Sequence, residues 1–241
     1  MHRQFLIMKT GSTVPSLLAQ GEDFENWFIA GSDLPSSRFV VCSLHLGGSL
    51  PALDRLCGIL ITGSPANITE NAPWNDTGSD YLRAARERGV PILGVCYGHQ
   101  LVASAFGGQV DFNPQGRGVG TATITLTPAA TKDPLLGPLA PVCKAQVSHA
   151  QAVLVLPTGA VRLATNSIDP NHAYRLGDSI WCVQFHPEFN ARIMRAYIEQ
   201  RAETIASEGL PVEALMAGVE ETPEVSLILQ RFVAFCEARL V

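Results

Sequence analysis

Length, composition and charge narrow the classes of protein open to this chain. It has 241 residues, 46% hydrophobic and 16% charged, which excludes a disordered polypeptide and predicts a single domain over residues 1–241 with a substantial core. The net charge of −5, without a basic stripe, argues against nucleic acid as a partner, and no apolar run approaches the ~20 residues that cross a bilayer. We therefore expect a small polar substrate.

The first part of the chain alternates apolar runs with segments of suitable length for helices. Strands are predicted at 5–8, 39–43 and 58–62, and a fourth at 91–95 follows the charged, helix-like segment 79–88. The first run has too few apolar residues, and no small-residue cleavage site, to be a signal peptide. Alternating strands and helices predict an α/β fold with a flavodoxin-like, mostly parallel sheet covered by helices on both faces.

The middle of the chain changes character. Threonine alternates with apolar residues over 121–127, which predicts a half-exposed strand, and turn residues bound further strand candidates at 142–147, 160–164 and 180–185. We expect antiparallel strands to be added to the sheet in this region. Residues 190–241 are expected to form a C-terminal helical extension that caps the domain, with helices over 191–206 and 224–240.

Six cysteines are scattered along the chain, at positions 42, 57, 96, 143, 182 and 236. No two of them form a C-x-x-C pair, so neither a zinc ribbon nor a thioredoxin-like site is predicted, and we expect no metal or other cofactor. Reduced, scattered thiols are typical of a cytoplasmic protein.

Cys96 follows the apolar strand candidate directly and precedes a helix-like pattern that ends near Phe106. At such a strand-to-helix corner the side chain is thrust outward, and the amide N–H groups of the first helical turn carry a partial positive charge that favours a thiolate. Gly94 and Gly98 fit the corner, because larger side chains would collide where strand and helix meet. Cys96 is therefore the candidate nucleophile.

The run Phe-His-Pro-Glu over 185–188 supplies the groups that a thiol nucleophile needs. A free thiol with a pKa near ~8.5 is only a few per cent ionised at neutral pH, so a nearby cation is required. His186 can provide it, and Glu188 lies on the same face of an extended segment, where it can orient one imidazole nitrogen and leave the other to face sulfur. Cys96, His186 and Glu188 predict a catalytic triad, provided that folding brings the sulfur and the imidazole together.

Acyl transfer also needs hydrogen-bond donors for the developing oxyanion, worth roughly 3–4 kcal/mol each. The backbone N–H groups of Tyr97 and of Ser64, in the turn that begins at Gly63, are the candidates. This turn and the corner both follow the carboxyl ends of predicted strands, where ligands bind in open α/β sheets, so we expect them to face one another.

The runs Gly-Val-Cys-Tyr-Gly-His-Gln over 94–100 and Phe-His-Pro-Glu over 185–188 closely resemble the class I glutamine amidotransferase domain, in particular its GMP synthase-like members. The resemblance extends over about residues 5–190. Residues 59–67 are similar to the family's oxyanion loop, and residues 148–159 to its segment before the last strands.

The resemblance implies that Cys96 attacks the side-chain amide of glutamine, that ammonia leaves with a proton from His186, and that water hydrolyses the γ-glutamyl thioester. Gln100 would hold the amino acid end of the substrate. His149 and Ala150 are expected beside it, with His149 more plausible as a neutral structural histidine than as a second base. Gln151 replaces a residue that is often acidic in the family.

Gly118 is the second departure, because the family often has a glutamate at this position. Both departures bear on how the α-amino group of the substrate is held. The leading interpretation is a free-standing glutamine amidotransferase or glutaminase. Since 241 residues are expected to leave no room for an ATP-using synthetase domain, we expect the ammonia to be released or passed to a separate synthetase subunit. One alternative is a γ-glutamyl peptidase that acts on γ-glutamyl peptides or conjugates, and a second is a non-catalytic binding or regulatory domain of the same fold.

Overall fold

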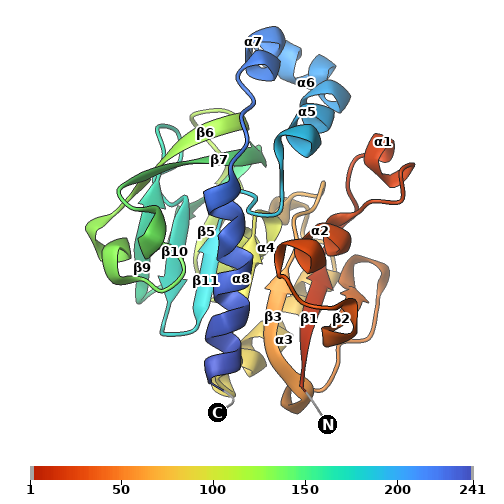
Figure 1. The fold of residues 1–241 in the computed structure, drawn as a ribbon, viewed down its shortest axis with the longest axis vertical. Helices are drawn as coiled ribbons and strands as arrows, with labels where there is room; N and C mark the ends of the chain where they lie inside the picture. Colours follow the sequence, from red (N-terminus) through yellow and green to blue (C-terminus); the bar gives the residue numbers. More distant parts are fainter. Residues whose placement is uncertain (1–2, 240–241) are drawn as a thin grey trace.

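The computed structural model describes residues 3–239, which fold around a nine-stranded sheet (Figure 1). Half of this sheet is parallel, in the order β2-β1-β3-β4-β11. Its strands are β1 (Gln4–Lys9), β2 (Phe39–Ser43), β3 (Leu56–Ile61), β4 (Ile92–Val95) and β11 (Ile180–Val183). With β11 as the fifth strand this is the flavodoxin-like order, so the predicted α/β class is confirmed.

The other half of the sheet is antiparallel and continues from β11 in the order β10-β9-β6-β7. Its strands are β10 (Ala173–Leu176), β9 (Ala160–Thr165), β6 (Gly118–Leu126) and β7 (Val142–His149). A separate two-stranded sheet pairs β5 (Gln109–Phe112) with β8 (Gln151–Val155). The expected antiparallel additions are present, whereas β5, β8 and β10 were not predicted.

Helices cover both faces of the parallel half. One face is packed by α2 (Phe24–Gly31) and α8 (Pro223–Ala238), the other by α3 (Trp74–Glu87) and α4 (Tyr97–Ala105). Strand β1 is continuously apolar because its successive side chains point to opposite faces of the sheet, and both faces are covered by helices. Phe5 and Ile7 join the cluster under α8, while Leu6 and Met8 join the cluster under α3 and α4.

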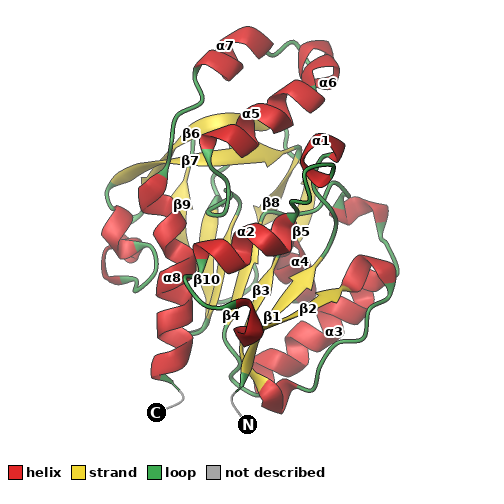
Figure 2. Ribbon diagram, turned by 45° about the vertical axis from the view of Figure 1, so that its right-hand side comes forward, coloured by secondary structure: helices red, strands yellow, loops and turns green. Residues whose placement is uncertain are grey.

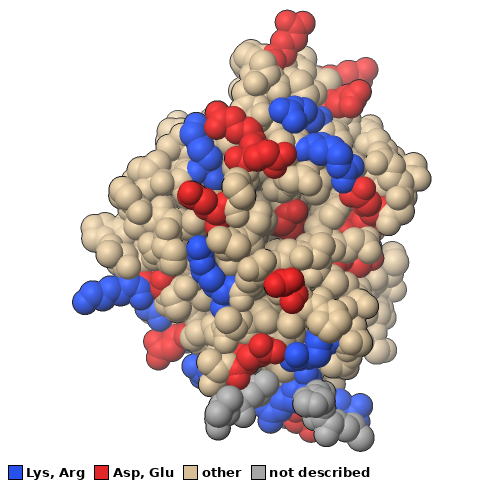
Figure 3. Space-filling model, viewed as in Figure 1, with Lys and Arg blue, Asp and Glu red and all other residues tan. Residues whose placement is uncertain are grey.

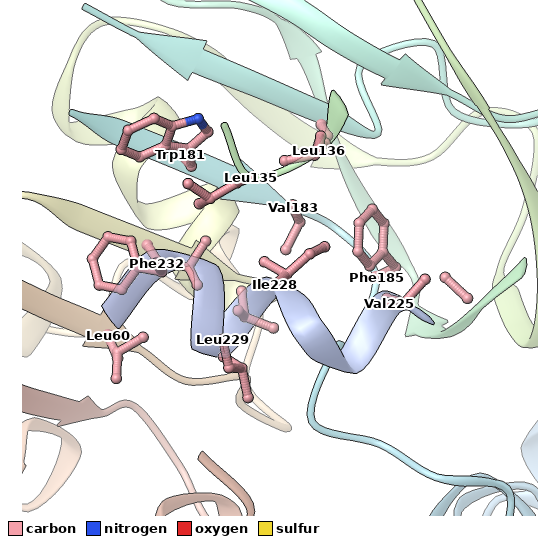
Figure 4. Packing of buried hydrophobic residues seen from close by; sticks show 14 of the residues in the cluster. Leu60, Leu135, Leu136, Trp181, Val183, Phe185, Val225, Ile228, Leu229 and Phe232 are labelled. Carbon is pink, nitrogen blue, oxygen red and sulfur yellow. The ribbon is translucent and has the colours of Figure 1, made fainter. Parts of the chain in front are cut away.

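Helix α8 supplies much of the core on its face of the sheet (Figure 4). Ile228, Leu229 and Phe232 are fully buried there, and the ring of Phe232 meets Trp181 of β11 edge to face at 6.5 Å. Truncating a buried phenylalanine to alanine costs about 3–5 kcal/mol, so α8 contributes strongly to stability. This helix therefore packs against β3 and β11, the two strands that flank β4.

Four shorter helices gather at the end of the molecule where the parallel strands finish (Figures 1 and 2). They are α1 (Pro15–Leu18), α5 (Ala191–Gln200), α6 (Ala202–Ser207) and α7 (Val212–Ala217). Their buried side chains, among them Leu17, Met194 and Ile205, form a third cluster together with Phe189 and with Phe24 and Trp27 of α2. This cluster lies next to the carboxyl ends of the parallel strands.

Two of the predicted helices need correction. The stretch between β2 and β3 holds only two short 3₁₀ turns, Leu44–Leu46 and Leu53–Arg55, because Gly47 and Gly48 interrupt the pattern and Gly47 adopts a left-handed conformation with φ 76°. The helix predicted over 191–206 is broken at Arg201, which leaves α5 and α6 as separate helices. The helix predicted over 224–240 corresponds to α8, but residue 240 lies outside the described residues. Residues 1–2 and 241 also lie outside them.

No helix within residues 3–239 is both long enough and apolar enough to span a membrane. On the face drawn in Figure 3, acidic and basic side chains are interspersed, and no extended basic surface is visible. All six cysteines are buried and free of disulfides.

Candidate active site

Cys96 occupies the corner between β4 and α4, as the sequence pattern predicts. Its backbone has φ 52° and ψ −101°, a conformation that is rare for a residue with a side chain and costs about 1–3 kcal/mol. Two hydrogen bonds hold the corner: the Cys96 amide donates to the carbonyl of Val183 at 2.9 Å, and the Gly98 amide donates to the carbonyl of Thr62 at 3.2 Å. Strand β11 and the end of β3 therefore fix the thiol.

The two glycines that flank the corner are required by close packing. A Cβ at Gly94 would lie 2.6 Å from the carbonyl oxygen of Gly98, and a Cβ at Gly98 would lie 2.7 Å from the Cβ of Ile61. Both distances are shorter than van der Waals contact, so α4 approaches β3 and β4 too closely for any side chain there. The steric reason predicted for Gly94 and Gly98 is thus present in the structure.

His186 and Glu188 form a buried pair at the end of β11. Nδ1 of His186 lies 2.8 Å from Oε1 of Glu188, and the ring of Phe189 stacks on the imidazole at 4.0 Å with an interplanar angle of 14°. Burial lowers the pKa of His186, but the charges of Glu188 and Cys96 outweigh it and raise that pKa above its ordinary value of 6.5. The protonated form of the His186 imidazole is therefore favoured.

Cys96 and His186 line the same cavity, of about 300 Å³. The charge of Cys96 is among the causes that raise the pKa of His186. Within the described part of the chain, however, Nε2 of His186 has no hydrogen-bond partner, and Sγ of Cys96 is directed to the carbonyl of Ser148 at 3.9 Å. The two groups are thus close, but their hydrogen bond is not aligned in this state. Catalytic hydrogen bonds often tighten only when substrate is bound.

The turn that follows β3 presents the second predicted oxyanion donor. The carbonyl of Gly63 accepts hydrogen bonds from the hydroxyls of Thr10, at 3.0 Å, and Thr62, at 2.9 Å. Because a trans peptide is planar, fixing this carbonyl also fixes the N–H of Ser64 on the opposite side. Among residues 3–239, no acceptor is bonded to the N–H of Ser64 or of Tyr97.

The same turn also lies against the histidine. A Cβ at Gly63 would lie 3.0 Å from Cε1 of His186 and 3.3 Å from Phe24, so a side chain there would crowd the histidine. Oγ of Ser64 donates to the carbonyl of Thr10 at 2.8 Å, and Ser64 lines the same cavities as Cys96. The turn and the corner therefore face one another, as expected.

A first cavity of about 320 Å³ contains the three residues predicted to bind substrate, Gln100, His149 and Ala150. The amide nitrogen of Gln100 donates to the carbonyl of Gln151 at 2.9 Å and to Oε1 of Gln184 at 3.0 Å. This arrangement fixes the side chain and leaves Oε1 of Gln100 as its acceptor for a ligand. Ala150 contributes backbone and lies at the turn between β7 and β8.

His149 is neutral in this environment. Its Nδ1 lies 2.9 Å from the carbonyl of Gln151, and burial, together with His172, lowers its pKa to about 4. Its Nε2 abuts Gly118, where a Cβ would lie only 2.6 Å away. Any side chain at position 118 would therefore displace this ring, which gives the glycine at that position a steric role.

Gln151, the other departure from the family pattern, is engaged with the loop after β3. Its Oε1 accepts from the amide of Ile68 at 3.0 Å, and its Nε2 donates to Oγ1 of Thr69 at 2.6 Å. Both polar ends of the side chain are thus bonded within the protein, although the residue lines the first cavity. Gln151 thus links the segment that follows β3 to β8.

Behind His149, the donor groups of His149, Asp169 and His172 lie within 4.8 Å of one another and could hold a metal ion. Oδ2 of Asp169 lies 3.1 Å from Nδ1 of His172, and its Oδ1 accepts from the amide of Asn171 at 2.9 Å. Burial opposes the charge of Asp169, but His172 lowers its pKa overall. Within the described residues, Nε2 of each histidine is left without a hydrogen-bond partner.

Several residues at the site were not predicted. Arg201 and Ser148 line both cavities, Tyr197 lines the second, and Thr10 donates to the carbonyl of Gly63 in the turn after β3. Arg201 stands in a segment whose pattern indicates only an amphipathic helix, and Thr10 follows a strand as many polar residues do. Their positions depend on packing between distant segments, which local sequence does not reveal.

The fold and this site define a class of proteins: flavodoxin-like α/β proteins with a cysteine at a strand-to-helix corner and a buried histidine–glutamate pair at the end of the neighbouring strand. A family model described as "Glutamine amidotransferase class-I" matches residues 49–203. The chain belongs to this family, and the resemblance noted in the sequence is confirmed.

Curated relatives include two kinds of enzyme. Gamma-glutamyl peptidase 3 of Arabidopsis thaliana is 28% identical over 153 residues, 61% of each chain. A glutamine-hydrolyzing GMP synthase subunit from Halobacterium salinarum is 40% identical over 102 residues, 41% of this chain and 53% of that protein. The matched region thus spans less than two thirds of the length of either relative.

Solved structures agree with the fold. A glutamine amidotransferase from Thermotoga maritima superposes with a TM-score of 0.77 at 17% identity, covering 98% of this chain and 99% of that one. A second, from Methylobacillus flagellatus, has a TM-score of 0.78 at 23% identity, covering 99% and 95%. At these identities the comparison establishes the architecture alone.

Proposed function

We propose that this protein is a cysteine hydrolase of γ-glutamyl amides, working through a γ-glutamyl thioester. The observation that carries the proposal is the placement of His186, hydrogen-bonded through Nδ1 to Glu188 at 2.8 Å and lining one cavity with Cys96. Such a pair favours the thiolate and the imidazolium together, which is the state that a cysteine nucleophile requires.

The reaction starts when the thiolate of Cys96 attacks the γ-carbonyl carbon of the substrate, and the carbonyl oxygen becomes an oxyanion. The N–H groups of Ser64 and Tyr97 stabilise this oxyanion, each by about 3–4 kcal/mol. The imidazolium of His186 then gives its proton to the amide nitrogen, the carbon–nitrogen bond breaks, and the amine leaves. Water, deprotonated by His186, attacks the thioester and releases the γ-glutamyl group as a carboxylate, while the proton from water restores the imidazolium–thiolate pair.

Two substrate classes fit this chemistry. Hydrolysis of glutamine releases ammonia, which a separate synthetase subunit could receive, and the similarity to the GMP synthase subunit favours this candidate. Hydrolysis of a γ-glutamyl peptide releases an amino acid or peptide, and the similarity to gamma-glutamyl peptidase 3 favours this one. Both classes share the thioester, so the assignment of Cys96, His186 and Glu188 is the same for each.

The test compares ammonia release from glutamine with amino acid release from γ-glutamyl dipeptides, using the purified protein and its Cys96→Ser variant. Turnover of either substrate by the wild type but not by the variant supports the proposal, and mass spectrometry should detect the γ-glutamyl adduct on Cys96. Failure to cleave any γ-glutamyl compound, with Cys96 resistant to alkylation at neutral pH, would overturn it. That result would instead favour a non-catalytic domain of the same fold.

A further inference from the structure

A second cavity lies beside the sulfur of Cys96, on the side of His186. His186 and Tyr197 line this cavity only, whereas Gln100 and His149 line only the first one. Because His186 gives its proton to the departing nitrogen in the proposed reaction, the second cavity is the leaving-group side of the site. The first cavity then holds the γ-glutamyl group.

The size of the second cavity is informative about the leaving group. It holds about 300 Å³, whereas a molecule the size of water or ammonia needs only about 10–15 Å³ measured in the same way. Ammonia would leave this space almost entirely unused. An amino acid or a short peptide is the leaving group that matches it.

Arg201 gives this space a positive charge. It lines both cavities at the break between α5 and α6, where its Nη1 donates to Oγ of Ser148 at 3.2 Å and its guanidinium stacks over the ring of Tyr197 at 5.2 Å. Between residues 3 and 239, no carboxylate forms an ion pair with Arg201 and no acidic side chain lines either cavity. A partly buried cation without a carboxylate partner favours an anionic ligand.

Arg117 provides an internal comparison. It also lines the first cavity, but its Nε and Nη2 each lie 2.7 Å from the carboxylate of Glu208, so its charge is already neutralised within the protein. Within residues 3–239, the guanidinium of Arg201 has no carboxylate partner; it donates to the hydroxyl of Ser148 and stacks on the ring of Tyr197. Its guanidinium therefore keeps donors in a planar fork, the geometry that binds a carboxylate through two parallel hydrogen bonds.

We propose that Arg201 binds the carboxylate of the leaving group, so that γ-glutamyl amino acids or peptides with a free C-terminal carboxylate are the preferred substrates. This inference rests on the proposed function and narrows its substrate class. The guanidinium of Arg201 stacks on the ring of Tyr197, which lines only the second cavity, and this contact places the guanidinium on the leaving-group side. Glutamine, which carries no carboxylate on its leaving group, gains nothing from this contact.

The experiment measures kcat/KM for γ-glutamyl-alanine and for γ-glutamyl-alaninamide, which differ only in the leaving-group carboxylate. The wild type should prefer the acid by on the order of tenfold to a hundredfold, the range expected for a hydrogen-bonded charge. Arg201→Gln should abolish this preference, and Arg201→Lys should keep part of it. Arg117→Gln is the matched control, and it should retain the preference of the wild type for the acid.

The same comparison can overturn the proposal. Cleavage of both substrates by the wild type without a preference for the acid would show that Arg201 does not bind the carboxylate of the leaving group. An equal loss on both substrates in Arg201→Gln would place Arg201 at the γ-glutamyl end, which also contradicts the proposal. Thermal unfolding of each variant identifies any loss that comes from misfolding, and Arg201→Lys then provides the comparison in a folded protein.

Alkylation of Cys96 separates this inference from the proposed function, because it requires no turnover. The ratio of the rates with anionic iodoacetate and neutral iodoacetamide should fall more in Arg201→Gln than in Arg117→Gln. If no γ-glutamyl compound is cleaved, the proposed function fails and the substrate assignment fails with it. The ratio of the two alkylation rates still shows whether Arg201 attracts an anion to Cys96. Turnover with an unchanged ratio and no preference for the acid overturns this inference alone.

Discussion

Oε1 of Glu188 lies 2.8 Å from Nδ1 of His186, and both side chains are almost entirely buried. At this distance the carboxylate both orients the ring and raises the pKa of the imidazole. The stacked ring of Phe189 covers one face of His186 and keeps water from weakening the pair. The histidine therefore stays protonated above pH 6.5, where it can serve as the acid for a departing amine.

Glu188→Gln should shift the alkaline limb of the kcat/KM profile to lower pH. The wild-type pKa of His186 is raised by Glu188 and Cys96 against the effect of burial, so the proton on His186 is lost only well above its ordinary value. Removing the charge of Glu188 lowers that pKa, and the acid form is lost earlier as pH rises. The measurement is the kcat/KM profile of both proteins between pH 5 and 10. An alkaline limb at the same pH in the wild type and in Glu188→Gln would show that Glu188 does not raise the pKa of His186.

His186→Ala provides the comparison for this variant. It removes both the acid and the base, whereas Glu188→Gln removes only charge and some orientation, so the loss in kcat should be larger for His186→Ala. The reverse order of activities would contradict the assignment of His186 as the proton-transfer group.

Cys96→Ser should reduce turnover by on the order of 10⁴-fold or more while the fold is kept. The change is nearly isosteric, and the hydrogen bonds that hold the corner use the backbone, not the side chain. Steady-state product release and thermal unfolding check the two parts of the prediction. Residual activity close to the wild type would remove Cys96 as the nucleophile.

Thr10→Val should lower kcat by roughly tenfold to a hundredfold with little change in KM, because misplacing one oxyanion donor acts mainly on the transition state. The hydroxyl of Thr10 donates to the carbonyl of Gly63, and together with the hydroxyl of Thr62 it fixes the direction of the Ser64 N–H. Single-substrate kinetics measure the split between kcat and KM.

Thr127→Val is a suitable control for Thr10→Val. It also removes a hydroxyl that donates to a backbone carbonyl, that of Arg162 at 2.8 Å, but it lies outside both cavities. Its kinetics should match the wild type. Equal kinetic losses in the two variants would mean that Thr10 affects only general stability.

The parallel half of the fold could be predicted because a strand buried on both faces is continuously apolar, as in Leu56–Ile61. Strands β5 and β8 escaped prediction because they are short and partly exposed, with Phe112 at 56% and Val155 at 47% exposure. The helix expected before β3 was wrong because glycines favour turns there. Length suitable for a helix is weaker evidence than periodicity.

The candidate triad could be proposed because each part has a local signature, a strand-to-helix corner for Cys96 and a His-x-Glu run at a strand end. Arg201 could not be proposed, since its place at the cavity depends on the break between α5 and α6 and on packing against Ser148, 53 positions away in the sequence. Local patterns reveal groups that are adjacent in sequence. They do not reveal charges that tertiary packing brings to a site.

Gly98→Ala should destabilise the protein even though it places a better helix former inside α4. The gain in helix propensity is about 1 kcal/mol. Against it, the new Cβ would lie 2.7 Å from the Cβ of Ile61 and 2.8 Å from its carbonyl oxygen, and forcing atoms into a packed core costs about 1–3 kcal/mol. The obstructing atoms belong to strand β3, which cannot move away as a flexible side chain could, so the clash should exceed the gain. Chemical denaturation should show a lower free energy of unfolding, and a more stable variant would mean that α4 is free to shift away from β3.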